Sequence, residues 1–164
     1  MKRVVVTGMG LVTPFGCGKS HNWKSLISAK SGATKITKFD FTKYKCQVAC
    51  EVPIGNGENG TFNAEDWIER KEIKKIDDFI KYAMAAGEEA FQESNLGTIN
   101  DPQSYRAGCI IGSGMGGLPG IEQTSIDYSN GKKISPFFIT GRIINMPAGY
   151  LSIKYNLKGP NYST

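Results

Sequence analysis

Glycine clusters at one point of this chain, directly after a short apolar run. Residues 108–111 read Gly-Cys-Ile-Ile, which predicts a buried strand, and glycines follow at positions 112, 114, 116 and 117. Glycine loses more chain entropy on folding than any other residue, so such a cluster is favoured only where the backbone bends or another group comes close. The segment 108–118 therefore predicts a tight strand-to-helix turn or, as the functional interpretation, the wall of a substrate channel.

A second glycine pair, Gly8 and Gly10, follows three valines near the amino terminus. The valines predict a buried strand over residues 3–7. A dinucleotide-binding fingerprint would need a third glycine three positions after Gly10, where this chain has Thr13 followed by Pro14. No strand ending in an acidic residue follows about 20 residues further on. A nucleotide-binding α/β domain is therefore a weaker alternative to a structural turn.

Helices alternate with short strands along the rest of the chain. The strongest helix signal covers residues 71–94, where apolar side chains recur at helical spacing and small residues at 83–87 allow another backbone to approach. The other expected elements are helices over 21–29 (capped by Ser20), 118–129 and 139–155, and strands over 47–52 and 107–111. This alternation favours a parallel α/β sheet in one domain.

Composition and charge exclude several classes of function. The 164 residues are 40% hydrophobic and carry a net charge of +5, which suits a core-forming chain with a modest basic excess. No basic stripe with interleaved aromatic residues accompanies that charge, so we expect no nucleic-acid partner. No stretch approaches a membrane span, and the apolar run at residues 4–6 is too short for a signal peptide. We expect no membrane partner and a cytoplasmic location.

The cysteines and the single histidine do not form a recognisable metal or catalytic site. Cys17, Cys46, Cys50 and Cys109 include no CxxC pair, and no histidine stands near them in a metal-binding spacing. We therefore predict no metal site and reduced thiols. His21 lies near a helix start, far from either glycine cluster in sequence, and is expected at the surface or at a helix cap.

A basic cluster opens the strongest predicted helix. Arg70, Lys71, Lys74 and Lys75 recur three or four positions apart, so most of them project from one side. A solvated helix face is the simplest interpretation. However, cations at a helix N-terminus oppose the helix dipole, which makes the placement locally unfavourable. The basic charge of this chain would suit an acidic protein partner as well as it would suit a nucleic acid.

Six motifs in order make the chain resemble the β-ketoacyl-acyl-carrier-protein synthases, closest to the type II elongating enzymes of fatty-acid synthesis. Each motif is weak alone, but together they cover nearly the whole chain in the family's order and approximate spacing. The motifs occupy residues 3–14, 70–77, 112–118, 134–138, 145–149 and 159–160.

The resemblance implies a thiolase-like layered α/β/α fold, of which residues 1–164 are the incomplete N-terminal portion of one synthase domain. It implies decarboxylative condensation of an acyl thioester with malonyl-acyl-carrier protein, no cofactor other than the carrier's phosphopantetheine, and a homodimer when complete. The family's nucleophilic cysteine and two histidines would follow Thr164, so no catalytic residue is predicted and this chain alone is expected to be inactive. A split reading frame, an expressed piece and an ordered portion of a longer chain all remain open, and the preferred acyl chain length is not determined.

The resemblance also implies roles for individual side chains. The residues implied to dock the acyl carrier protein are Lys71, Lys74, Lys75, Lys132 and Lys133. Met115 is implied to lie beside the acyl chain, and Phe138 to reach the acyl pocket of the partner subunit; core packing is the alternative for both. A non-catalytic interaction protein that keeps only the carrier-docking and dimer-forming surfaces is the competing interpretation.

Overall fold

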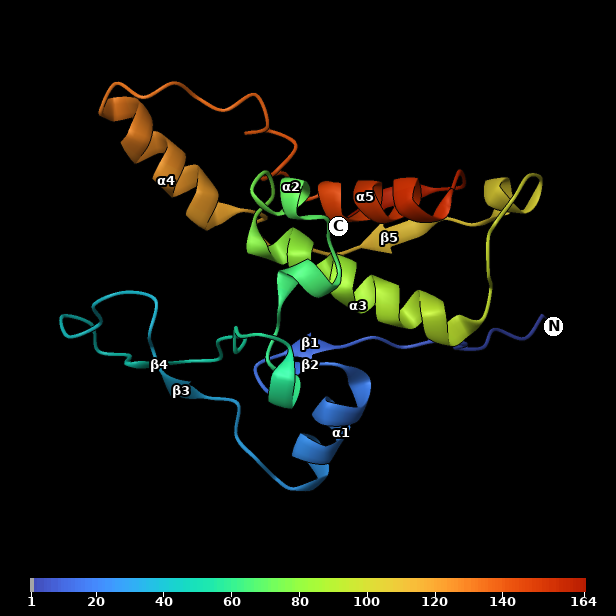
Figure 1. The fold of residues 1–164 in the computed structure, drawn as a ribbon, viewed down its shortest axis with the longest axis horizontal. Coiled ribbons are helices and arrows are strands. Elements are labelled where there is room, and N and C mark those ends of the chain that lie inside the picture. Colours follow the sequence, from blue (N-terminus) through green and yellow to red (C-terminus); the bar gives the residue numbers. More distant parts are fainter. Residues whose placement is uncertain (1) are drawn as a thin grey trace.

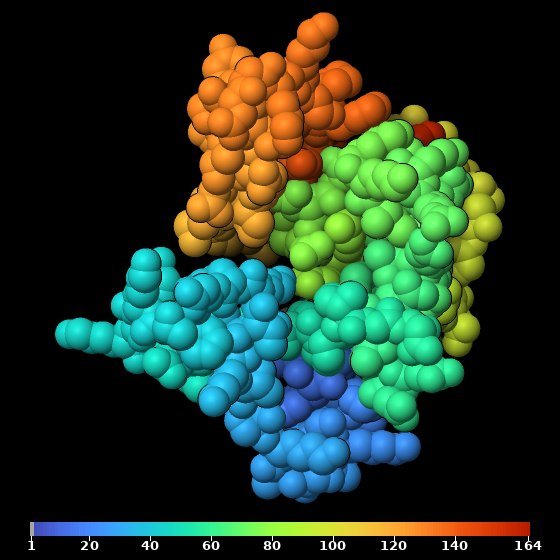
Figure 2. Space-filling view, turned by 60° about the vertical axis from the view of Figure 1, so that its left-hand side comes forward, coloured from blue at the N-terminus to red at the C-terminus, as the bar shows by residue number. Residues whose placement is uncertain are grey.

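The computed structural model describes residues 2–164, with one long helix running through the middle (Figure 1). The helices are α1 (Lys19–Ile27), α2 (Arg70–Ile73), α3 (Asp78–Ser94), α4 (Leu118–Ser129) and α5 (Met146–Tyr155), with 3-10 turns at Glu58–Gly60, Ala64–Asp66 and Gln103–Arg106. The strands are β1 (Val12–Thr13), β2 (Gly16–Cys17), β3 (Thr34–Lys35), β4 (Val48–Ala49), β5 (Cys109–Ile111) and β6 (Asn161–Ser163). β1–β2 and β3–β4 pair antiparallel, whereas β5 and β6 pair in parallel. Figure 2 shows α4 and the loop after it (orange) as a lobe that stands out from the green body of α3 and the residues before it.

The core lies between α3 and α5. Ile80 of α3 is fully buried, and Leu151 of α5 packs against α3 at Gly87, where an added Cβ would lie 2.7 Å from the leucine's δ carbons. The stacked rings of Phe91 and Tyr155 lie between the same two helices, with centroids 3.8 Å apart. Gly87 therefore makes room for Leu151 of α5, whereas the backbone approach predicted for residues 83–87 is made at Ala86 by the amino-terminal segment.

The amino-terminal segment crosses α3 at backbone contact. Gly8 and Gly10 lie so close to the carbonyl oxygens of Ala90 and Ala86 that an added Cβ would overlap them. The amide after Gly10 donates to a carboxylate oxygen of Glu89 at 2.9 Å. Both glycines therefore serve packing against a helix, and α3 fills the space that a nucleotide phosphate would need beside them. This contact argues against the nucleotide-binding alternative.

The two apolar runs predicted as buried strands are not buried in this chain. Val4, Val5 and Val6 are 96%, 72% and 80% exposed, and residues 3–7 pair with no strand within the described part of the chain. β5 forms as predicted, but its Ile110 is 66% exposed. A parallel strand is buried only when other strands flank it and helices cover both sheet faces. β5 has β6 as its single neighbour among residues 2–164, so the predicted burial is wrong here.

The helix predicted over residues 71–94 is interrupted. α2 ends at Ile73, the chain turns, and α3 begins only at Asp78. Within the turn, Ile76 is buried in the core, and Asp77 is extended with φ −79° and ψ 166°. Its amide donates to the Gly141 carbonyl at 3.1 Å. Apolar periodicity misses the interruption because these contacts with distant residues override local helix propensity.

Two further helices begin at positions other than those predicted. α1 begins one residue before Ser20, the predicted cap, and Gly18 takes the N-cap position. The helix predicted over 139–155 begins only at Met146, because the chain forms consecutive turns from Pro136 up to that residue. The end of α3 and the full extent of α4 agree with the prediction.

Candidate functional site

The predicted docking lysines of the first cluster lie in one short segment just before α3. Lys71 belongs to α2, Lys74 is the C-cap residue of that helix, and Lys75 follows in the turn. Lys71 and Lys74 are exposed, whereas Lys75 is half-buried. We call Lys71, Lys74 and Lys75 the α2 lysines.

Acidic neighbours partly neutralise the α2 lysines. The Lys71 ammonium lies 2.6 Å from a carboxylate oxygen of Glu69, and this hydrogen bond raises the lysine pKa. Lys75 Nζ lies 2.7 Å from Glu72 Oε1. Within residues 2–164 Lys74 makes no ion pair. Exposed ion pairs contribute about 0–1 kcal/mol, so a more acidic partner can displace these carboxylates. Lys74 is the α2 lysine whose charge is most available to such a partner.

Lys75 also connects α2 to a distant segment. Its ammonium lies 4.6 Å from the centroid of the Phe137 ring, a cation–π distance. Phe137 precedes Phe138, the predicted acyl-pocket residue, within the turns of residues 136–145. The α2 lysines and this segment are therefore in direct contact.

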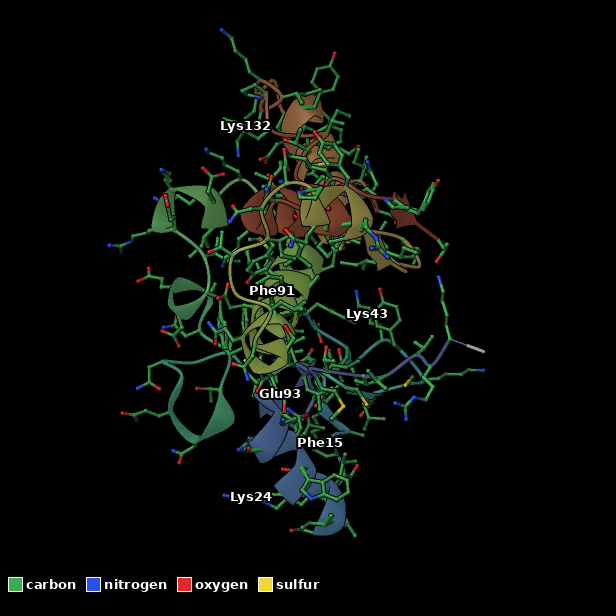
Figure 3. The ribbon with its side chains drawn as sticks, turned by 90° about the vertical axis from the view of Figure 1, so that its right-hand side faces the viewer. Phe15, Lys24, Lys43, Phe91, Glu93 and Lys132 are labelled. Atoms are coloured by element: carbon green, nitrogen blue, oxygen red, sulfur yellow. The ribbon has the colours of Figure 1, made fainter. Side chains whose placement is uncertain are left out.

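Lys132 and Lys133 are exposed but lie apart from the α2 lysines. Lys132 donates to Asp127 at 2.9 Å, so it folds back onto the end of α4 (Figure 3). α4 begins beside the start of α3 and points away from it (Figure 1). The structure does not bring the five predicted docking residues into one contiguous cluster.

Met115 stands at an open position of the glycine turn. Its side chain is 70% exposed, and an added Cβ at the neighbouring Gly114 would meet no atom within 4 Å. Met115 is therefore not part of the core that residues 2–164 form among themselves. Two positions later the turn is closed, because the Gly117 amide donates to the Arg142 carbonyl at 2.8 Å. That bond joins the turn carrying Met115 to the segment carrying Phe138, whose own side chain is half-buried.

The sequence interpretation missed two residues that lie between these segments, Asp77 and Arg142. Their side chains are 15% and 17% exposed, and Arg142 Nε lies 3.3 Å from Asp77 Oδ1. This contact is an ion pair rather than a hydrogen bond, because Nε has no hydrogen-bond partner among the described residues. Burial raises the pKa of Asp77, although the Arg142 charge acts in the opposite direction. A lone arginine among the isoleucines of residues 139–144 was the available sequence signal.

Among residues 2–164 no hydrogen bond joins a cysteine to His21, so no thiol has the adjacent base that activates a nucleophilic cysteine. All four cysteines are free, and burial raises the pKa of both Cys17 and Cys109, which favours the unreactive thiol form. His21, expected at the surface or at a cap, is half-buried with Nε2 2.9 Å from the Phe15 carbonyl oxygen. Among residues 2–164 there is no group of three or more metal-ligating side chains, and no helix has the length and hydropathy of a membrane span.

Comparison with known proteins gives one consistent result. The family model for the beta-ketoacyl synthase N-terminal domain matches residues 1–164. The chain is 44% identical to 3-oxoacyl-(acyl-carrier-protein) synthase 2 of Rhizobium meliloti and 43% identical to the Coxiella burnetii protein of the same name, in each case over 99% of the chain. It spans 39% and 38% of the length of these two relatives.

Solved structures show the same fold. The ishigamide ketosynthase/chain length factor superposes on 98% of this chain with a TM-score of 0.74 at 19% identity, covering 39% of that protein. The AntDE:AntF structure, a type II PKS acyl-carrier protein in complex with its ketosynthase, gives a TM-score of 0.63 at 22% identity over 99% of this chain and 42% of the matched one. The fold is therefore an incomplete α/β fold of the layered, thiolase-like kind found in ketosynthases.

Proposed function

The chain belongs to the β-ketoacyl synthase family, as its N-terminal domain, and on that premise we propose that the protein elongates fatty acids. The reaction is the decarboxylative condensation of an acyl thioester with malonyl-acyl-carrier protein. The observation that carries this proposal is the 44% identity to a 3-oxoacyl-(acyl-carrier-protein) synthase 2 across almost the whole chain. Substrates arrive on the phosphopantetheine of an acyl carrier protein, and no other cofactor is required.

Residues 2–164 contribute carrier docking and part of the acyl-pocket wall rather than the nucleophile. The exposed cations Lys71 and Lys74 support docking of an acidic carrier, and Lys132 and Lys133 provide a second, separate contact. The exposure of Met115 in an open turn supports its role beside an acyl chain. Burial raises the pKa of the Cys17 and Cys109 thiols, which argues against either of these two cysteines as the nucleophile.

We also propose that the complete protein is a cytoplasmic homodimer. Phe137 is 42% exposed, and Ile134 and Ile139 on the same segment are 50% and 56% exposed, a set of apolar side chains that a second copy would cover. The free cysteines suit a reducing compartment. In the matched AntDE:AntF structure, a ketosynthase binds an acyl-carrier protein, which supports the choice of partner.

Carrier binding by charge-reversal variants tests the proposal. The chain with Lys71→Glu, Lys74→Glu and Lys75→Glu is titrated with acyl carrier protein at low salt and at about 1 M salt, where the Debye length falls to about 3 Å. We expect the Kd at low salt to rise at least about tenfold and most of the difference to disappear at high salt, because rim charges act through screened electrostatics. Among single variants, Lys74→Glu is expected to have the largest effect.

A matched control carries the same change in net charge at a distant place. Lys24, Lys30 and Lys35 are exposed, and Lys24 lies at the opposite end of the molecule from Lys132 (Figure 3). Replacing these three by glutamate should leave the Kd close to that of the unmodified chain. An equal loss of affinity in both triple variants, or no loss in either, would refute docking at the α2 lysines.

A further inference from the structure

α4 begins without a cap from its own sequence. Its N-cap residue, Gly117, has no side chain, so the first amides of the helix need acceptors from elsewhere. The amide of Gly120, in the first turn, donates to Asp77 Oδ2 at 3.0 Å. Asp77 itself stands at the N-cap position of α3, where an aspartate commonly caps its own helix, yet it makes no such bond. Its carboxylate therefore caps α4 across a tertiary contact.

Arg142 connects the start of α4 to the segment that carries the α2 lysines. Its Nη1 donates to the backbone carbonyl of Lys75 at 3.0 Å, and its own carbonyl accepts from the Gly117 amide at 2.8 Å. Its charge faces the Asp77 carboxylate at 3.3 Å. One partly buried arginine thus contacts the turn that bears Lys75, the turn that bears Met115, and the residue that caps α4.

The Asp77–Arg142 pair explains why glycine occupies positions 117 and 120. An added Cβ at Gly120 would overlap both the Asp77 carboxylate and the Arg142 guanidinium, and one at Gly117 would overlap the carboxylate. Leaving a largely desolvated charge without its partner is unfavourable, so we expect the two partly buried side chains to keep or change position together. Gly117 and Gly120 therefore serve a protein contact, which leaves Gly114 and Met115 as the open part of the turn.

We propose that Asp77 and Arg142 are positioning residues that couple carrier docking on the α2 lysines to the segments carrying Met115 and Phe138. This inference rests on the proposed function. Lys75 is both a docking residue and the acceptor of the Arg142 bond, so a carrier that orders the α2 turn also orders the guanidinium. Arg142 in turn holds the glycine turn, because its backbone carbonyl accepts from the Gly117 amide, and it belongs to the segment 134–145 that carries Phe138. Contiguous polar contacts of this kind transmit such ordering.

Hydrogen exchange of the 164-residue chain, with and without saturating acyl carrier protein, tests the coupling. In the unmodified chain we expect the carrier to slow exchange in peptides covering residues 112–120 and 134–145, although neither contains an α2 lysine. In Asp77→Asn, which keeps an oxygen for the Gly120 amide but loses the charge facing Arg142, carrier binding should persist and the slowing in both peptides should be lost. Asp78→Asn, the same change at the exposed adjacent residue, should behave like the unmodified chain.

The outcomes separate this inference from the function on which it rests. Carrier binding without slowed exchange in the unmodified chain, or equal slowing in Asp77→Asn, overturns the coupling alone. Loss of slowing in Asp78→Asn as well marks a general structural effect and also overturns it. Failure of the unmodified chain to bind the carrier overturns the proposed function and the coupling with it. If Asp77→Asn does not fold, the double variant Asp77→Asn/Arg142→Gln leaves no unpaired charge and takes its place with the same expected result.

Discussion

The two glycine-rich segments look alike in sequence but have opposite surroundings. Gly8 and Gly10 press against the carbonyls of α3, whereas an added Cβ at Gly114 would enter open space. In the first segment a helix takes the room that glycine leaves. In the second, Met115 stands exposed at an open point and Asp77 closes the turn a few residues later. Glycine after an apolar run therefore does not by itself show whether the backbone meets other protein atoms or open space.

Replacing one glycine of each segment by alanine should give the largest difference in unfolding free energy. Gly10→Ala places a methyl group against the Ala86 carbonyl, which cannot move without distorting α3, so we expect a loss of about 2–3 kcal/mol in unfolding free energy. Gly114→Ala has no atom to meet and should change stability by no more than about 0.5 kcal/mol. Urea unfolding of both variants measures the difference. Similar losses at the two positions would contradict the contrast.

A smaller effect on the free energy of unfolding is expected at Tyr82 of α3, one helical turn before Ala86. Its ring meets the Phe62 ring edge-to-face, with the ring centroids 5.0 Å apart. The Tyr82 hydroxyl is buried without a hydrogen-bond partner among the described residues. Tyr82→Phe removes an unpaired polar group and keeps the ring, so at neutral pH we expect stability to stay equal or rise by up to about 1 kcal/mol. Urea unfolding that shows a loss above about 1 kcal/mol would mean that the hydroxyl has a partner.

The buried hydroxyl of Tyr82 also leads to a prediction about stability at high pH. Burial, with a smaller contribution from the Asp78 charge, raises the pKa of Tyr82 to about 12, compared with about 10 in an unfolded chain. The folded state therefore favours the neutral phenol. That stabilisation is present below about pH 10 and is lost as the pH rises toward 12. Urea midpoints at about pH 9 and pH 11 should fall more for the unmodified chain than for Tyr82→Phe, and an equal fall would refute the raised pKa.

Features of the fold that depend on neighbouring residues along the chain were predictable from the sequence. α4, the end of α3 and the close approach to its small residues all follow from local periodicity, stop signals and side-chain size. The interruption before Asp78 was not predictable, because it depends on bonds from Asp77 to Gly120 and Gly141. The burial predicted for residues 3–7 failed because a strand needs sheet partners that lie far away in sequence.

In the candidate site, too, features set by the local sequence were predictable, whereas contacts between distant segments were not. The placement of the α2 lysines in one segment followed from their spacing. Their pairing with Glu69 and Glu72, and the separation of Lys132 from them, depend on rotamers and on the direction of α4. The Asp77–Arg142 pair joins residues so far apart in sequence that no local pattern connects them. Docking by these lysines and the roles of Met115, Phe138 and Lys133 stay predictions.

The central proposal, that residues 2–164 dock a carrier and line a pocket without supplying the nucleophile, is tested most directly by turnover. The 164-residue chain is mixed with acyl-carrier and malonyl-carrier protein, and ketoacyl product is measured beside a no-enzyme blank and an iodoacetamide-treated sample. We expect carrier binding but no product above the blank, because among residues 2–164 no cysteine is hydrogen-bonded to a histidine that could activate it, and His21 Nε2 lies at the Phe15 carbonyl oxygen instead. Burial also raises the pKa of the Cys17 and Cys109 thiols. Product above the blank that disappears on alkylation would contradict this, since it would require an active cysteine within these residues.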